Sequence, residues 1–178
     1  MKLDVRSMIL TALFAALTAV GALMVIPLPF SPVPVTLQVF FVLFAGALLG
    51  SKLGAVSQIV YVFLGCLGLP VFAGGTSGFG VLIGPTGGYI FGFILAAYVI
   101  GKLTEKKPRL YYFGILAALI VGVLIIYLAG VLQLMMVAKL NFSKAFFVGV
   151  LPFIGVDLIK AVLVSFLIQR VKPHVLKG

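Results

Sequence analysis

Residues 155–164 read GVDLIKAVLV and place Asp157 and Lys160 inside an otherwise apolar stretch from Ala145 to Gln169. A segment of this length and apolarity is typical of a membrane-spanning helix. A charge at the centre of such a helix costs about 2.5–3.5 kcal/mol on the insertion scale, so neither side chain is expected to face lipid. At positions i and i+3 the two side chains share one helix face. We expect them near the membrane midplane, either in a binding pocket or as a neutralised pair that fixes helix packing.

The rest of the chain has the same apolar character. Of its 178 residues, 63% are hydrophobic and 9% are charged, and the mean hydropathy is +1.35. In a soluble globular domain about a quarter of the residues are charged. The composition therefore predicts an integral membrane protein that lies in a lipid bilayer.

The lengths of the uncharged stretches predict the number of membrane passes. Residues 7–51 and 53–101 contain no charged side chain, and each is long enough for two crossings at about 1.5 Å per helical residue. Residues 110–138 and 145–169 supply one crossing each. Six transmembrane helices are expected.

Two segments interrupt the long uncharged stretches. IPLPFSPVPVT at residues 26–36 contains four prolines, which a regular helix does not tolerate. Seven glycines lie between Pro70 and Gly88 and favour irregular backbone. The sequence therefore predicts an all-α integral membrane fold, a single domain over residues 1–178, with six helices in one compact bundle and a glycine-rich outer loop between the third and fourth helices.

The basic residues predict the orientation, because cytoplasmic loops carry the excess of lysine and arginine. With both termini in the cytoplasm, Lys139 and Lys144 fall outside and ten basic residues fall inside. The inside set is Lys2, Arg6, Lys52, Lys102, Lys106, Lys107, Arg109, Arg170, Lys172 and Lys177. This bias accounts for the net charge of +10 without nucleic acid as a partner.

Enzymatic chemistry is poorly supported by the sequence. There is no GxxxxGK[ST] phosphate loop, no HExxH motif and no histidine and cysteine cluster with metal-ligand spacing. We expect no enzyme activity, no metal and no cofactor. A process driven by ATP would need its ATPase from another chain.

Several polar residues could join Asp157 and Lys160 in a pocket, because the predicted topology places them at the outer face. They are Thr36, Gln38, Thr76, Ser77, Thr86 and Tyr89. The glycine-rich loop that carries some of them is expected to cover the site as a lid or to form a tight turn packed by its own backbone.

Small residues repeat along the first predicted helix at three- and four-residue spacing. They are Ala12, Ala15, Ala16, Ala19 and Ala22. Such a stripe lets another helix approach closely, either within the bundle or in a partner protein. The pattern alone does not choose between the two.

Three motifs carry a resemblance to a known family. They are PVPVTLQ at residues 32–38, GPTGGYIFGF at 84–93 and DLIK at 157–160. Over nearly its whole length the chain resembles BioY, the biotin-specific substrate-binding S component of energy-coupling factor (ECF) transporters. The resemblance implies capture of biotin at the outer side of a prokaryotic cell membrane. It also implies delivery through a transmembrane coupling subunit and two ABC-type ATPases.

The resemblance also implies functional residues. Biotin would be bound by Asp157, Lys160, Thr36, Gln38, Gly84, Thr86, Gly87 and Tyr89. The coupling subunit would dock on an AxxxA-type surface that contains Ala12 and Ala16. The ureido ring of biotin has two N–H donors and one carbonyl acceptor, which complement a carboxylate beside an ammonium. Lys160 could serve either this ring or the carboxylate tail.

Two other functions remain open from the sequence. A secondary transporter could use Asp157 as a proton-coupling carboxylate, and uptake driven by a pH gradient without ATP would identify it. A structural membrane subunit would use Asp157 and Lys160 only for assembly, and would not bind biotin.

Overall fold

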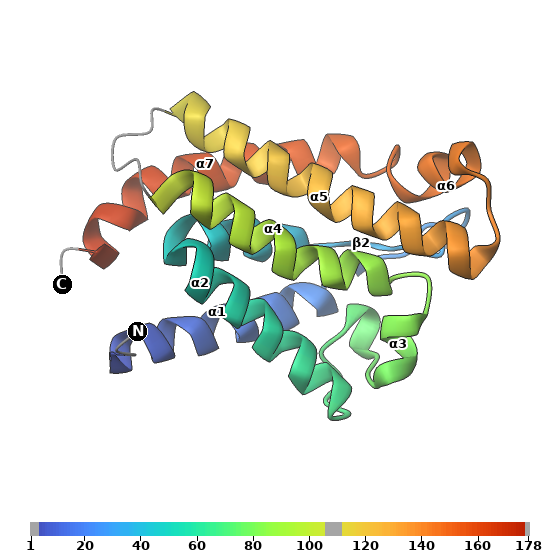
Figure 1. Cartoon of the computed structure of the whole chain (residues 1–178), viewed down its shortest axis with the longest axis horizontal. Helices are drawn as coiled ribbons and strands as arrows, with labels where there is room; N and C mark the ends of the chain where they lie inside the picture. Colours follow the sequence, from blue (N-terminus) through green and yellow to red (C-terminus); the bar gives the residue numbers. More distant parts are fainter. Residues whose placement is uncertain (1–3, 106–111, 177–178) are drawn as a thin grey trace.

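The computed structural model describes residues 4–105 and 112–176, which form seven α-helices, one 3₁₀-helix and a two-stranded ribbon (Figure 1). In chain order these elements are α1 (Val5–Leu23), β1 (Val25–Ile26), β2 (Val35–Thr36), α2 (Gln38–Cys66), η1 (Ala73–Gly75), α3 (Phe79–Ile83), α4 (Gly87–Glu105), α5 (Tyr112–Ala138), α6 (Phe142–Gly149) and α7 (Ile154–Leu176). The start of α1 and the end of α7 lie at one end of the bundle. The ribbon, α3 and α6 lie at the other (Figure 1).

The long helices are membrane spans by length and composition. Within the described residues, α1, α2, α4 and α5 are each long and apolar enough to cross a membrane, and α6 with α7 could form one further bent span. The expected six transmembrane helices are therefore not confirmed, although the predicted helical membrane bundle is present. The ribbon β1–β2 also departs from the expected all-α fold.

Helix α2 turns back on itself at Gly50, which has φ 81° and ψ −178°. Gln38 Nε2 lies 2.6 Å from the hydroxyl of Tyr61, whereas 23 residues of straight helix would separate them by about 35 Å. Figure 1 shows the two arms of α2 running in different directions. The turn stands beside Lys52, where the charge pattern separates the second predicted helix from the third.

The carboxylate of Glu105, at the end of α4, closes this turn. Its Oε2 accepts hydrogen bonds from the backbone N–H of Ser51 at 2.9 Å and from the Ser51 hydroxyl at 2.8 Å. Ser51 begins the second arm of α2, where backbone N–H groups lack helical partners and favour a negative charge. The turn of α2 and the end of α4 are therefore fixed to each other.

The last predicted pass, Ala145–Gln169, is wrong as one continuous helix. Helix α6 ends at Gly149, α7 begins at Ile154, and the two are bent by 52°. Pro152 lies in the break, has no backbone N–H and disfavours helical backbone at the preceding residue. Asp157 therefore stands in the first turn of α7, where the helix dipole favours an anion.

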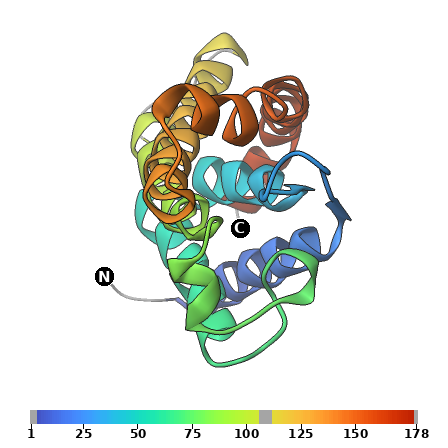
Figure 2. The ribbon, with the colours of Figure 1, turned by 90° about the vertical axis from the view of Figure 1, so that its right-hand side faces the viewer.

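The proline-rich segment between α1 and α2 forms a short antiparallel ribbon. Val25 pairs with Thr36, and Ile26 pairs with Val35. These four side chains are β-branched and suit extended backbone, and the prolines between them prevent a helix. Figure 2 looks onto this end of the bundle and shows the ribbon beside the start of α2.

The glycine-rich segment between α2 and α4 packs against the second arm of α2. Phe72 is fully buried and meets the ring of Tyr61 edge to face, with ring centroids 5.6 Å apart. The backbone N–H of Gly78 donates to the oxygen of Gly65 at 2.8 Å. The outer loop expected here therefore contains η1 and α3 and is fixed by its own backbone and by Phe72.

The basic residues predicted to lie on opposite sides of the membrane lie at opposite ends of the bundle. Arg6 in the first turn of α1, Lys52 at the turn of α2, Lys102 in the last turn of α4 and Arg170 near the end of α7 belong to one end. Lys139 and Lys144 lie around the connection from α5 to α6 at the other end. The other inside residues, whose side chains lie outside the described part, are Lys2, Lys106, Lys107, Arg109, Lys172 and Lys177.

A close contact between α2 and α4 generates the first prediction. A Cβ atom added to Gly101 would overlap the backbone of Gly50 and Ser51, which cannot move without opening the turn. Gly101→Ala should lower the free energy of unfolding by about 1–3 kcal/mol, the usual cost of overpacking. Thermal unfolding of the purified protein in detergent measures the effect.

Gly155→Ala is the matched control, because Gly155 is also helical but has no atom within 4 Å of an added Cβ. The midpoint temperature of thermal unfolding of this variant should stay unchanged or rise, since alanine reduces the conformational freedom of the unfolded chain. Equal midpoints for Gly101→Ala and the unchanged protein would contradict the close packing of α2 on α4.

Candidate functional site

Asp157 and Lys160 form a buried ion pair on α7. Only 3% of Asp157 and 6% of Lys160 is exposed, and Lys160 Nζ lies 2.7 Å from Asp157 Oδ1. The predicted contact between the two charges is therefore confirmed. Two charges removed from solvent need further hydrogen bonds to offset their desolvation.

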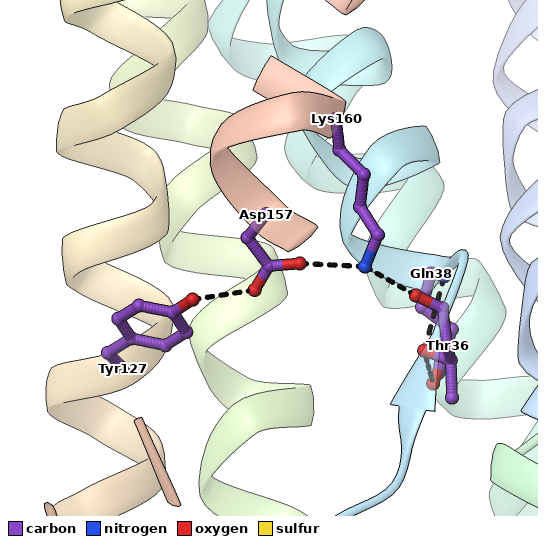
Figure 3. Close-up of polar contacts among 5 residues, drawn as sticks. All are labelled: Thr36, Gln38, Tyr127, Asp157 and Lys160. Carbon is purple, nitrogen blue, oxygen red and sulfur yellow. Dashed lines mark hydrogen bonds and ion pairs between the residues drawn. The ribbon is translucent and has the colours of Figure 1, made fainter. Parts of the chain in front are cut away.

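Both charges have a second partner on another element (Figure 3). The hydroxyl of Tyr127, on α5, donates to Asp157 Oδ2 at 2.8 Å. Lys160 Nζ donates to the backbone oxygen of Thr36, in β2, at 2.6 Å. The pair thus connects α7 with α5 on one side and with β2 on the other. Its carboxylate accepts one hydrogen bond on each oxygen.

Thr36 is held in turn by the start of α2. Its hydroxyl donates to Gln38 Oε1 at 2.9 Å and accepts from the backbone N–H of Gln38 at 3.3 Å. Gln38 Nε2 donates to the hydroxyl of Tyr61 at 2.6 Å. These buried contacts fix the backbone oxygen that receives Lys160, so the polar cluster is preorganised.

This cluster forms the polar part of a cavity with about 570 Å³ of empty space, including its opening. Small-molecule sites generally have mostly apolar linings with a few polar groups. The lining consists of Val33, Pro34, Thr36, Gln38, Val39, Ala73, Thr86, Tyr89, Ile90, Phe93, Ile126, Tyr127, Phe153, Asp157 and Lys160. The cavity is suited to a small ligand that is mainly apolar but has several hydrogen-bonding groups.

Six of the eight residues expected to bind the substrate line this cavity. They are Thr36, Gln38, Thr86, Tyr89, Asp157 and Lys160. Tyr89 is buried, and its hydroxyl donates to the backbone oxygen of Gly149 at 2.7 Å. It thereby fixes the end of α6 against α4.

Gly84 and Gly87 are outside the cavity lining. Gln133 Nε2, from α5, donates to the oxygen of Gly84 at 2.8 Å and to that of Leu82 at 2.6 Å. A Cβ on Gly87 would collide with the oxygen of Leu82. Gly87 therefore permits close packing of the start of α4 on α3 and on Gln133 of α5, whereas Gly84 contributes the backbone oxygen that joins it to α5. Thr76 and Ser77 are exposed and also absent from the lining, whereas Ala73 of the same loop reaches it.

Sequence reasoning missed Tyr127 and the aromatic wall formed by Phe93 and Phe153. Tyr127 could have been suspected because it is a hydrogen-bonding side chain near the middle of a 27-residue apolar helix. The two phenylalanines carry no such signal, since the chain contains 16 of them.

The described residues contain no group of three or more histidine, cysteine, aspartate or glutamate side chains that could hold a metal ion. The carboxylate in the cavity is already paired with an ammonium and a phenol. The arrangement is suited to binding a neutral hydrogen-bonding group between fixed donors and acceptors.

Comparisons with known proteins show the family of the chain. The BioY family profile matches residues 1–177. The biotin transporter BioY of Thermotoga maritima is 47% identical over 167 residues, which cover 94% of this chain and 96% of that protein. The probable biotin transporter BioY of Pyrococcus horikoshii is 44% identical over 165 residues, with 93% and 95% covered.

A solved structure shows the same fold. The crystal structure of the S-component for biotin from an ECF-type ABC transporter matches with a TM-score of 0.89 and 30% identity. The match covers 95% of this chain and 92% of that chain. The long helices of this chain and their connections therefore have the arrangement of an S component.

The fold and the cavity define a class, a multi-pass membrane protein with a cavity between its helices that is suited to a small ligand. Its relatives are named as transporters. The chain belongs to the BioY family, as its motifs predict.

The buried ion pair generates the second prediction. Lys160→Met leaves the carboxylate of Asp157 buried without its ammonium, and removal of one partner from a buried pair costs about 3–5 kcal/mol. The variant should unfold at a lower temperature than the unchanged protein in the absence of ligand. Adding Asp157→Leu should restore most of the lost stability, since no unpaired charge remains.

Lys144→Met is the control, because Lys144 is exposed on α6. It should leave the unfolding midpoint within experimental error of the unchanged protein. The double variant Asp157→Leu/Lys160→Met could instead be as unstable as Lys160→Met alone. An unpaired carboxylate would then not be the cause of the lost stability.

Proposed function

We propose that this chain is the biotin-capture S component of an ECF transporter. It binds biotin from the outer side of a prokaryotic cell membrane and delivers it with a transmembrane coupling subunit and two ABC-type ATPases. The observation that carries the proposal is the Asp157–Lys160 pair, buried in the cavity beside the backbone oxygen of Thr36. Family membership and the likeness to a biotin S-component support it.

The chemistry of the cavity fits biotin. The ureido ring needs acceptors for two N–H groups and a donor for one carbonyl, and the polar cluster offers carboxylate and amide oxygens beside an ammonium. The fused ring and the aliphatic chain of biotin need an apolar wall, which Ile90, Phe93 and Phe153 supply. Buried polar groups of this kind give selectivity, because an analogue that lacks their partners leaves them unpaired.

The proposed membrane orientation places the cavity on the outer side. Both termini lie in the cytoplasm, at the end of the bundle that carries Arg6, Lys52 and Arg170. The ribbon β1–β2 and the cavity rim then face outward. The two arms of α2 and the bent pair α6–α7 complete six crossings with α1, α4 and α5.

ATP-driven transport requires a partner, because the chain has no phosphate-binding loop. Ala12 and Ala16 are exposed on α1, whereas Ala15 and Ala22 are buried against the bundle. The small-residue stripe thus divides into an inner face that packs within the chain and an outer face open to another helix. This outer face is the proposed docking surface for the coupling subunit.

The third prediction tests biotin capture. The purified protein should bind biotin saturably without nucleotide, and Asp157→Asn should raise the dissociation constant at least tenfold, or about 1.4 kcal/mol. The reason is that the amide no longer balances the charge of Lys160. Titration calorimetry in detergent or lipid nanodiscs measures both values.

Asp4→Asn makes the same chemical change at an exposed residue and should bind biotin as the unchanged protein does. No saturable binding by the unchanged protein would refute the proposed function. Uptake driven by a pH gradient in vesicles without ATP would instead indicate a stand-alone transporter.

The fourth prediction separates capture from delivery. Ala16→Trp places a bulky ring on the docking surface, so it should abolish copurification with the coupling subunit and ATP-dependent uptake. Biotin binding by the isolated variant should stay within about threefold of the unchanged protein, which is less than 1 kcal/mol.

Ala117→Trp is the control, because Ala117 is exposed on a different helix, α5. It should retain copurification and uptake. If Ala16→Trp loses biotin binding as well as uptake, the residue supports the bundle. If it loses neither, the coupling subunit docks elsewhere.

A further inference from the structure

We propose that the short helix α3 lies within the lipid bilayer, where acyl chains of the leaflet at the cavity end cover Phe79 and Ile83. The partner of this surface is a lipid and not a protein. The inference goes beyond the proposed function, because it does not depend on which ligand the cavity holds.

Helix α3 has one packed side and one exposed apolar side. Leu82 is buried, and its backbone oxygen accepts a hydrogen bond from Gln133 of α5 at 2.6 Å. Phe79 and Ile83 are one turn apart on the same face and are 70% and 76% exposed. Whether this pair meets lipid or water depends on its depth in the membrane.

The two spans that α3 connects are shorter than the membrane. Lys52 and Lys102 mark the ends of these spans that are remote from α3. From these lysines towards α3, residues 53–66 of α2 and 87–101 of α4 rise about 21 Å and about 22 Å. The hydrocarbon core of a bilayer is about 30 Å thick. The segment 67–86, which contains α3, therefore begins and ends inside this core.

Helix α5 shows how far a full-length span reaches at the same end of the bundle. Its 27 residues rise about 40 Å, and Lys139 follows directly. Figure 1 shows α3 set back along the bundle from the connection between α5 and α6. Figure 2, which looks onto this end, shows α3 (green) at the edge of the bundle. This position directs its exposed face towards lipid.

The apolar surface of α3 continues on α2. Phe63 and Leu67, at the end of α2, are 60% and 65% exposed. The hydrogen bond from the N–H of Gly78 to the oxygen of Gly65 joins the start of α3 to this end. Residues 53–101 contain no charged side chain, so no charge opposes burial of the segment in lipid.

The backbone of the segment is suited to membrane depth. Irregular backbone is tolerated there only where its polar groups are paired within the protein. Every third residue from 72 to 87 donates its N–H to a backbone oxygen of the same segment or of α2. These donors are Phe72, Gly75, Gly78, Val81, Gly84 and Gly87. The exposed hydroxyl of Thr76 is also paired, with the oxygen of Ala73 at 3.1 Å.

The lipid contact bears on the cavity, because the same segment forms part of its wall. Ala73 lines the cavity, and Phe72 packs on the ring of Tyr61. With Phe79 and Ile83 in lipid, the membrane supports this wall from outside. Movement of the segment away from the cavity then displaces lipid instead of water.

Fluorescence quenching tests the inference, because the chain contains no tryptophan and a single introduced one reports its own surroundings. Phe79→Trp and Ile83→Trp are placed separately in nanodiscs of phosphatidylcholine with bromine in the upper or the lower half of its acyl chains. Iodide is the quencher in water. Upper-half bromine should reduce the emission of both variants more than iodide does. Either variant is sufficient if the other fails to fold.

Leu124→Trp and Ser143→Trp are the matched controls. Leu124 is 58% exposed near the middle of α5, so lower-half bromine should reduce its emission most. Ser143 is exposed beside Lys144 on α6, so iodide should reduce its emission most.

Iodide quenching of the α3 variants as strong as that of Ser143→Trp would place α3 in water and overturn the inference. Resistance to both bromine and iodide would overturn it as well, since another protein chain would then cover this face. Biotin binding plays no part in the measurement, so either result leaves the proposed function in place.

Discussion

The hydrogen bond from Lys160 Nζ to the backbone oxygen of Thr36 joins residues that are 124 positions apart in the chain. An ammonium has three donors and no acceptor, and each donor left unpaired in an apolar bundle is unfavourable. Lys160 is paired with Asp157 within α7, so its contact with another element is the backbone oxygen of Thr36, and α7 packs where the two meet. This requirement fixes the rotation of α7 and the depth of the ribbon together, and the cavity lies between them.

In the proposed function, the same bonds decide which ligand the cavity recognises. The cluster is neutral overall and largely satisfied before a ligand arrives, because Tyr127 and Lys160 occupy one oxygen of Asp157 each. A ligand must match these donors and acceptors or leave them unpaired, which favours selectivity. Phe93 and Phe153 belong to the apolar wall around the cluster. This wall adds apolar contact surface for a ligand without adding charge.

Helical spacing alone predicts the contact between Asp157 and Lys160, and the side of the membrane predicts that Thr36 and Gln38 lie near them. Tyr127 was not predicted because α5 is almost uniformly apolar, so its sequence does not show which face turns inward. Gly84 and Gly87 belong to a family motif, but in the fold Gly84 accepts a hydrogen bond from Gln133 and Gly87 permits close packing on Gln133. Tertiary packing, which spacing does not encode, decides both cases.

The two breaks in the long helices differ in how clearly the sequence indicates them. The turn at Gly50 lies next to Lys52, so charge indicates it in the sequence, whereas the bend before Ile154 lies within an uncharged stretch. An uncharged segment of suitable length predicts that the chain crosses, but its internal bends depend on local backbone such as Pro152. This is why Asp157 was expected inside a helix and is found at the start of one.

The proposed capture site and the proposed docking surface lie on opposite sides of the contact between α1 and the start of α2. None of the cavity-lining residues that the structure describes belongs to α1. Yet the backbone oxygen of Gly21 accepts a hydrogen bond from the N–H of Leu37 at 3.1 Å, and a Cβ at Gly21 would approach Phe41 within 2.8 Å. Leu37 lies between Thr36 and Gln38. The inner face of α1 therefore supports the segment that receives Lys160, while its outer face, with Ala12 and Ala16, stays open to another helix.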